Sequence, residues 1–180
     1  MQREVLAERK RILGAEHRDT LAVANNLADS LARQGKYAEA EDMQREVLPV
    51  IKRVLGAEDP NTHAIATNLA TSLSYQGKYA DAEEIEREVL ALKKRELGTE
   101  HPDTLITAGN LALSISFQEK HAEAEQIQRE VLAVMTRVLG AEHPDTLIAA
   151  SNLAYCLQLP EQRKHTEECV QGATGKAGRG

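Results

Sequence analysis

Hydrophobic positions along the chain fall into stripes of helical period, separated by short polar breaks. Between residues 102 and 117 the apolar side chains recur every three or four residues, which places them on one side of a helix: Leu105, Ala108, Leu111, Ala112 and Ile115. After the polar break at residues 118–121, a second stripe contains Ala124, Ile127, Val131 and Met135. The pattern predicts two successive helices, which we name helix A and helix B.

The residues that flank these stripes are typical of helix ends. Pro102 suits the first helical turn, where its missing N–H would have no partner, and Asp103 favours the positive end of the helix dipole. In corresponding breaks earlier in the chain, Gly35 and Gly77 supply the left-handed residue of a tight helix–helix turn. Glu119 takes the same place in this pair of helices, so we expect its turn to be strained.

The whole pattern returns every 42 residues. Leu-Gly-Ala-Glu-His-Arg-Asp-Thr begins at residue 13, and close variants begin at residues 55, 97 and 139. Asn-Leu-Ala recurs from residues 26, 68, 110 and 152, and Arg-Glu-Val-Leu recurs from residues 3, 45, 87 and 129. Self-similarity at such a period indicates stacked helical units, which form extended binding surfaces.

These motifs, together with Gln-Gly-Lys-Tyr-Ala-Glu-Ala-Glu from residue 34, resemble the tetratricopeptide repeat, and more narrowly the 42-residue variety found in kinesin light chains. The resemblance covers roughly residues 3–168. It implies an all-α fold, an α-solenoid of antiparallel helix pairs in a right-handed superhelix. It also implies a concave groove lined by helices A, and a protein or peptide as partner.

By this pattern the array covers residues 1–170, and residues 171–180 are a disordered tail, because they are rich in glycine. The predicted parts of the array are an isolated helix B at 2–13, repeats at 19–60, 61–102 and 103–144, and a partial fourth repeat at 145–170. Neither end carries a polar capping repeat. One expectation is therefore an excerpt of a longer array, and the other is association of chains through their end helices.

Composition narrows the class of partner. The 28 acidic and 22 basic residues give a net charge of −6, which argues against binding to nucleic acid. No apolar run approaches the ~18 residues of a membrane span, and the first residues do not form a signal peptide. We therefore expect a cytoplasmic protein without membrane contact. Cys156 is predicted to be a small buried side chain, and Cys169 a free thiol.

The Glu-His-x-Asp clusters at 16–19, 100–103 and 142–145 are the strongest candidates for chemistry. Ligands one repeat apart would lie about 10 Å from each other, which is too far to share an ion. Within one cluster, the adjacent helix start already explains the carboxylates. The sequence also lacks a phosphate-binding glycine loop, a nucleophile elbow and a metalloprotease motif. We predict no metal, no cofactor and no enzymatic activity.

The asparagine of Asn-Leu-Ala recurs at one place on every helix A. A hydrogen bond to a neighbouring helix or loop is the favoured interpretation, and contact with a ligand remains the alternative. The four residues are Asn26, Asn68, Asn110 and Asn152.

Five places in each repeat share the side of helix A that the resemblance assigns to the groove. We call this set of residues the helix A face. It consists of Ala22, Asn25, Asp29, Ala32 and Arg33; Ala64, Thr67, Thr71, Ser74 and Tyr75; Ile106, Gly109, Leu113, Ser116 and Phe117; and Ile148, Ser151, Tyr155, Gln158 and Leu159. The face changes along the chain from polar and small to apolar and aromatic.

Aromatic residues are scarce, yet three of the five lie on this face: Tyr75, Phe117 and Tyr155. Together with Leu113 they are the predicted anchors for a partner peptide or helix. Packing of these rings between adjacent helices A is the alternative. Gly109 is expected to let a ligand backbone approach closely.

The charges on this face set the expected chemistry of the partner. Relatives that bind acidic peptides use basic residues and asparagine here, and only Asn25 and Arg33 fit that pattern, while Asp29 opposes it. An apolar or mixed segment is therefore favoured. The competing hypothesis is a self-assembling element that associates through its end helices, at Val5 and Ile12 for example, and leaves the groove unused.

Overall fold

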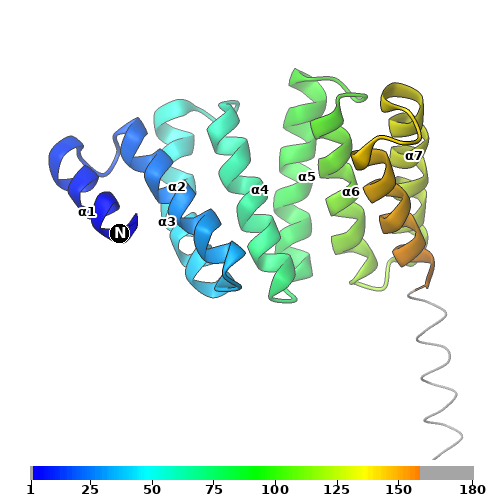
Figure 1. Ribbon diagram of the computed structural model, residues 1–180, viewed down its shortest axis with the longest axis horizontal. Coiled ribbons are helices and arrows are strands. Elements are labelled where there is room, and N and C mark those ends of the chain that lie inside the picture. Colours follow the sequence, from blue (N-terminus) through cyan, green and yellow to red (C-terminus); the bar gives the residue numbers. More distant parts are fainter. Residues whose placement is uncertain (1, 159–180) are drawn as a thin grey trace, which may run out of the picture. The chain divides into compact units, whose positions relative to one another are not determined.

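In the computed structural model, residues 2–158 are described, and every regular element in that part of the chain is a helix (Figure 1). The all-α prediction is therefore confirmed. Residues 144–158 form the last described helix, and the tail predicted at 171–180 lies outside the described residues. The preceding helices are α1 (Gln2–Leu13), α2 (Arg18–Arg33), α3 (Tyr37–Leu55), α4 (Pro60–Tyr75), α5 (Tyr79–Glu96), α6 (Pro102–Ser116) and α7 (His121–Leu139).

Two compact units make up the chain, residues 1–99 and residues 100–180. In the first unit, α1 to α5 each pack on the next helix, and α2 also contacts α4. In the second unit, α6 and α7 pack on each other as a pair. The helices A are thus α2, α4, α6 and the helix at 144–158, and the helices B are α1, α3, α5 and α7.

Burial confirms most of the predicted hydrophobic stripes. On α6 all five stripe residues are at most 8% exposed. On α7 Ala124, Val131 and Met135 are buried, whereas Ile127 is only half-buried. Its neighbour Gln128 is fully buried, which a hydrophobic stripe does not predict. In the first unit the largest cluster joins α2, α3 and α4 through Leu27, Ile51 and Ile65, among others.

The residue before each helix A caps it. The carboxylate of Asp59 accepts a hydrogen bond from the Asn61 N–H at 2.8 Å. At the other helix A starts a histidine takes this role, with the ring Nδ1 accepting from the N–H two residues later at 3.2 Å in each case: His17, His101 and His143. A side-chain acceptor here satisfies one of the unpaired N–H groups of the first turn.

Among residues 2–158, the three turns from a helix A to its helix B share one backbone geometry. Gly35 and Gly77 each have φ of 76°, and Glu119 has φ of 70°. The next residue donates its N–H to the carbonyl five residues earlier, at 3.0 Å in both glycine turns and 3.3 Å in the Glu119 turn. Since this conformation costs a residue with a Cβ about 1 kcal/mol or more, the predicted strain at Glu119 is confirmed.

Candidate functional site

The helix A face is divided between the two units. The predicted binding residues of the first unit lie on α2 and α4, where Arg33, Thr71 and Tyr75 are exposed and Asn25, Asp29 and Thr67 are half-buried. Those of the second unit lie on α6, at its end, and on the helix at 144–158. There Ile106, Phe117, Ser151 and Tyr155 are exposed, Leu113 is half-buried and Gly109 is buried.

The assignment of Ser116 to this face is wrong, and the assignment of Leu159 is not tested. Ser116 is only 1% exposed, because its hydroxyl turns inward to the thiol of Cys156 and lies 3.4 Å from Nδ1 of His121. Leu159 lies outside the described residues.

Two contacts join polar side chains on or beside the helix A face of the first unit. Arg33 Nε lies 2.8 Å from Asp29 Oδ2, so the positive charge that the sequence offers at the end of α2 is neutralised by its own helix. Asn68 Nδ2 donates to Asn25 Oδ1 at 3.5 Å, near the limit for a hydrogen bond. This contact joins α4 to α2, as the favoured interpretation of Asn68 requires.

The hydroxyl groups on this face bond to their own helices. Thr71 Oγ1 donates to the Thr67 carbonyl at 2.9 Å, and Ser151 Oγ donates to the Leu147 carbonyl at 3.0 Å. Each O–H therefore has a partner, and the methyl group of Thr71 adds apolar surface to the exposed side of α4.

Four aromatic side chains lie in two contacting pairs. In the first unit Tyr75 is 67% exposed and stacks on Tyr37 at the start of α3, with ring centroids 4.5 Å apart and planes 6° apart. In the second unit Phe117 and Tyr155 are 37% and 42% exposed, with centroids 5.8 Å apart and planes at 56°. The sequence predicts that Tyr75, Phe117 and Tyr155 share one face, but that prediction does not include Tyr37. The recurring Gln-Gly-Lys-Tyr motif could have pointed to it.

The side chain that lies close to the Gly109 backbone belongs to the protein itself. Its carbonyl accepts a hydrogen bond from Gln128 Nε2 at 2.8 Å, and a Cβ added at residue 109 would lie 3.8 Å from Gln128 Oε1. The neighbour of the missing side chain is therefore a buried amide of α7.

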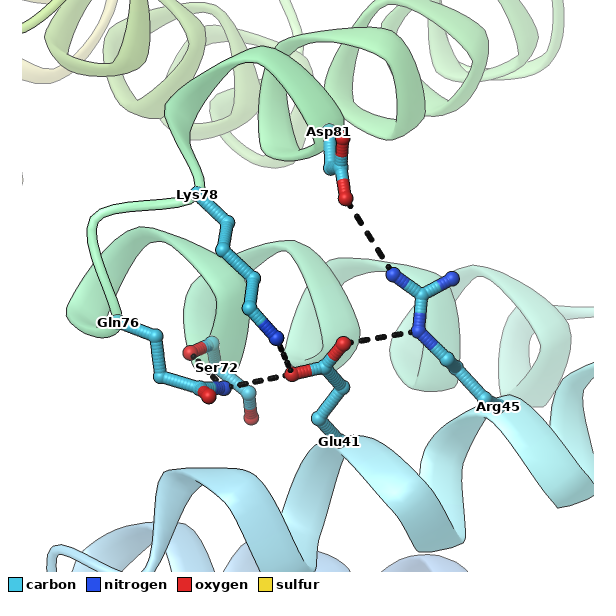
Figure 2. A network of polar contacts seen from close by, with 6 residues as sticks. All are labelled: Glu41, Arg45, Ser72, Gln76, Lys78 and Asp81. Carbon is cyan, nitrogen blue, oxygen red and sulfur yellow. Dashed lines mark hydrogen bonds and ion pairs between the residues drawn. The ribbon is translucent and has the colours of Figure 1, made fainter.

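Glu41 of α3 lies at the centre of a polar network that joins two successive repeats (Figure 2). Its carboxylate, on a residue only 6% exposed, accepts hydrogen bonds from Lys78 Nζ at 2.7 Å, Gln76 Nε2 at 2.8 Å and Arg45 Nε at 2.9 Å. Arg45 also reaches Asp81 of α5 at 3.5 Å. Cations and donors thus surround the buried charge on several sides.

This environment fixes the charge of Glu41. Burial alone would raise the pKa of its carboxyl group, but the bonds from Lys78, Arg45 and Gln76 outweigh that effect and lower the pKa to about 2. Glu41 belongs to Ala-Glu-Ala-Glu of one repeat, whereas Gln76 and Lys78 belong to Gln-Gly-Lys-Tyr of the next. Packing between repeats therefore explains why both motifs recur.

The Glu-His-x-Asp clusters also have structural roles. Arg53 of α3 lies 2.6 Å from Glu16, and Arg137 of α7 lies 2.6 Å from Glu100, a spacing of 37 residues in both cases. Arg95 pairs in the same way with Glu58. Each glutamate thus ties a loop to the following helix B, while the histidine caps helix A. Over residues 2–158, no group of three or more potential ligands is placed to hold a metal ion.

The sequence matches the tetratricopeptide repeat family in four overlapping segments, residues 1–52, 19–95, 62–114 and 103–165. The chain belongs to the tetratricopeptide repeat family. Tetratricopeptide repeats generally mediate protein–protein interaction and are generally non-catalytic scaffolds. Within residues 2–158, the pairs α2–α3, α4–α5 and α6–α7 are complete repeats, and each consists of a helix A followed by a helix B.

Several solved tetratricopeptide structures resemble this chain. A kinesin light chain-type protein of Podosopora anserina, with nearly identical TPR-like repeats, matches with a TM-score of 0.77 and 26% identity, over 99% of this chain and 86% of that chain. A variant of it matches with a TM-score of 0.79 at the same identity and coverage. BtubC (BKLC) from P. vanneervenii matches in fold, with a TM-score of 0.65 and 22% identity over 86% of this chain and 62% of that chain. No curated protein sequence matches.

Among the helices of the described region, none is both long and apolar enough to cross a membrane.

Proposed function

We propose that this tetratricopeptide array is a non-catalytic scaffold whose helix A face binds a peptide or helix of a partner protein. The observation that carries the proposal is the exposed pair of Phe117 and Tyr155, whose ring centroids are 5.8 Å apart. Large aromatic side chains dominate binding energy in protein recognition, because they offer much apolar area and lose little conformational freedom.

Tyr75 supports the same interpretation in the first unit. Its ring is 67% exposed, and one side of it is held by the parallel ring of Tyr37. A ring held in one orientation before binding loses less entropy when a partner packs against its free side. Tyr75 is therefore an anchor in the first unit, as Phe117 and Tyr155 are in the second.

The charge pairing on α2 favours an apolar or mixed partner segment. The ion pair of Arg33 with Asp29 leaves no net positive charge at that point of the face. On the helix A face of the second unit, Ile106 and Ile148 are 40% and 58% exposed and add aliphatic surface. An acidic segment would lose hydration there without gaining a paired cation.

The test is binding of the purified chain to a diverse array of short peptides, compared with the double variant Phe117→Ala/Tyr155→Ala. We expect a set of sequence-related peptides that bind the natural chain and are lost in the double variant. An absence of bound peptides, or binding indifferent to the double substitution, contradicts the proposal.

The matched control is Val138→Ala. Val138 lies in the same unit and is 43% exposed, but it belongs to α7, a helix B. Its substitution also removes exposed apolar surface, but that surface lies outside the helix A face. Peptide binding should therefore be unchanged. Equal losses in Val138→Ala and in the double variant would indicate non-specific adhesion to apolar surface.

Self-assembly through the end helices is a second candidate, favoured by the exposure of Val5 and Ile12 on α1 at 45% and 61%. If this is the function, the molar mass in solution rises with protein concentration, and Val5→Ser/Ile12→Ser abolishes that rise without changing peptide binding. A molar mass independent of concentration excludes it. Light scattering after gel filtration makes the measurement.

A further inference from the structure

Two crevices occupy the same place in the repeat, one inside each unit. In the first unit a crevice of about 130 Å³ lies among α2, α3 and α4. In the second unit a crevice of about 90 Å³ lies among α6, α7 and the helix at 144–158. Equivalent positions two repeats apart line both: Ala22 and Ile106, Asn25 and Gly109, Asn26 and Asn110, Ile51 and Met135, Asn61 and Asp145, and Ile65 and Ala149.

The two crevices differ in chemistry. Asparagine side chains, at residues 25, 26 and 61, give the first one a polar lining, and Asn25 is already bonded to Asn68. In the second, Ile106 replaces Ala22, Gly109 replaces Asn25, and Ile148 lines its edge. The exposure of Ile106 and Ile148, at 40% and 58%, places both at the mouth.

The absence of a side chain at Gly109 lets the second crevice extend to Gln128. The amide nitrogen of Gln128 bonds to the Gly109 carbonyl at 2.8 Å, whereas its Oε1 atom has no hydrogen-bond partner within the described part of the chain. The whole side chain is 0% exposed. A buried acceptor without a donor is unfavourable, and a donor that reaches it when the rim side chains shift recovers that loss.

We propose that this crevice is a subsite for one side chain of the bound partner: a small aliphatic group that ends in a neutral hydroxyl donor, as in threonine. This rests on the proposed function of the helix A face. We call the crevice the Gln128 subsite, formed by Ile106, Gly109, Gln128, Met135 and Ile148. The hydroxyl donates to Gln128 Oε1, and the aliphatic part packs against Met135 and the two isoleucines.

Polarity favours this class of side chain, and size permits it. One water needs about 10–15 Å³ of such space, so about 90 Å³ accommodates a group of several heavy atoms. The apolar walls disfavour a charged group, which would lose its hydration. Asn110 and Asn152 also line the crevice and offer N–H groups to the lone pairs of a hydroxyl.

Met135 provides a reporter inside the subsite. The chain has three methionines, and Met43 lies in the other unit, on α3. In protein labelled with ¹³C at the methionine methyl groups, we expect butan-2-ol to shift the Met135 resonance with saturation and to leave Met43 in place. Assignment follows from the resonance lost in Met43→Leu.

Two probes of the same size define what is recognised. Methyl isopropyl ether is an isomer of butan-2-ol without a donor, and sec-butylamine is charged at pH 7. We expect both to bind at least about fivefold more weakly than the alcohol, the factor one hydrogen bond provides. If the ether binds as tightly as the alcohol, the ligand does not need a hydrogen-bond donor, and that part of the proposal is contradicted. Tighter binding of the amine than of the alcohol contradicts the proposal that the ligand group is neutral. It indicates recognition by Asp145, which also lines the crevice.

Gly109→Ala blocks the subsite without strain. The added Cβ lies at ordinary contact distance, 3.8 Å from Gln128 Oε1. Alanine also has a higher helix propensity than glycine. We expect alcohol binding at least about fivefold weaker and a melting temperature unchanged or higher. Asn25→Ala, the equivalent position of the first unit, is the control and should bind the alcohol normally. Unchanged binding in Gly109→Ala overturns the proposal.

The solute titration and the peptide array fail independently. A Met135 resonance that does not respond to butan-2-ol removes the subsite but leaves peptides anchored by Phe117 and Tyr155 unaffected. If no peptide of the peptide array binds but butan-2-ol shifts the Met135 resonance with saturation, the proposed function is contradicted and only a small-solute site remains.

Discussion

Lys78 Nζ lies 2.7 Å from Glu41 Oε2, and this contact joins the turn of one repeat to the helix B of the repeat before it. The two residues come from motifs that the sequence repeats in fixed register. Their contact shows that these two recurring motifs hold successive repeats together in the first unit. The residues that differ between repeats include those at all five places of the helix A face, which is where we propose that the partner binds.

Glu41→Ala should destabilise the first unit by about 2 kcal/mol, because it removes the buried acceptor that Lys78, Gln76 and Arg45 share. Urea unfolding followed by circular dichroism measures the loss. The control is Glu46→Ala, which breaks the exposed pair of Glu46 with Lys10, 3.3 Å apart, and should cost about 1 kcal/mol or less. Equal effects of the two substitutions would contradict the network described for Glu41.

The contribution of Glu41 should also depend on pH. The pKa of its carboxyl group is about 2 in the folded protein, below the usual value of about 4.3. Its stabilising effect is therefore complete above about pH 4.3 and disappears as the pH falls towards 2. The difference in unfolding free energy between the natural chain and Glu41→Gln should shrink over that interval. A difference that stays constant from pH 6 to pH 2 would show that the charge is not responsible.

Glu119→Gly should stabilise the second unit by about 1 kcal/mol, because a φ of 70° is unfavourable for a residue with a Cβ and is tolerated by glycine. Thermal unfolding measures the gain. The reverse substitution at the equivalent turn, Gly77→Glu, provides the complementary control and should destabilise by a similar amount. A loss of stability in Glu119→Gly would mean that the Glu119 side chain contributes more than its backbone strain costs.

Cys156 should be a poorly reactive thiol. It is 2% exposed, as the sequence predicted for a small buried side chain, and burial raises the pKa of its thiol. Since the thiolate is the reactive form, a Cys169→Ser variant should react with a disulfide reagent at least about tenfold more slowly when folded than in urea. Equal rates in the two states would show that Cys156 is open to solvent.

The local part of this fold could be predicted from the sequence, because it depends on residues close together in the chain. The stripe from Leu105 to Ile115 predicts a buried face, and the glycine turns predict the strain at Glu119. The pairing of Glu41 with Lys78 could not be derived, because it requires knowing which residues the turn brings together. The same limit applies to the stacking of Tyr75 on Tyr37, because the recurring motif marks Tyr37 but not its neighbour in space. It also applies to Gln128, a polar residue in a stripe otherwise filled with apolar ones.

For the candidate site, sequence register placed Phe117 and Tyr155 on neighbouring helices A, and the structure brings their rings together. Register alone misplaced Ser116, because the last turn of α6 directs that hydroxyl inward. Whether a helical position faces solvent depends on the neighbouring helix as much as on its own period.

The most direct test of the central claim is the dissociation constant of an array-selected peptide, measured by titration calorimetry on the natural chain, on Phe117→Ala/Tyr155→Ala and on Val138→Ala. Loss of two exposed aromatic anchors should weaken binding at least about tenfold, whereas the substitution on α7 should leave it within about twofold. Equal dissociation constants for all three proteins would show that the partner is not held on the helix A face.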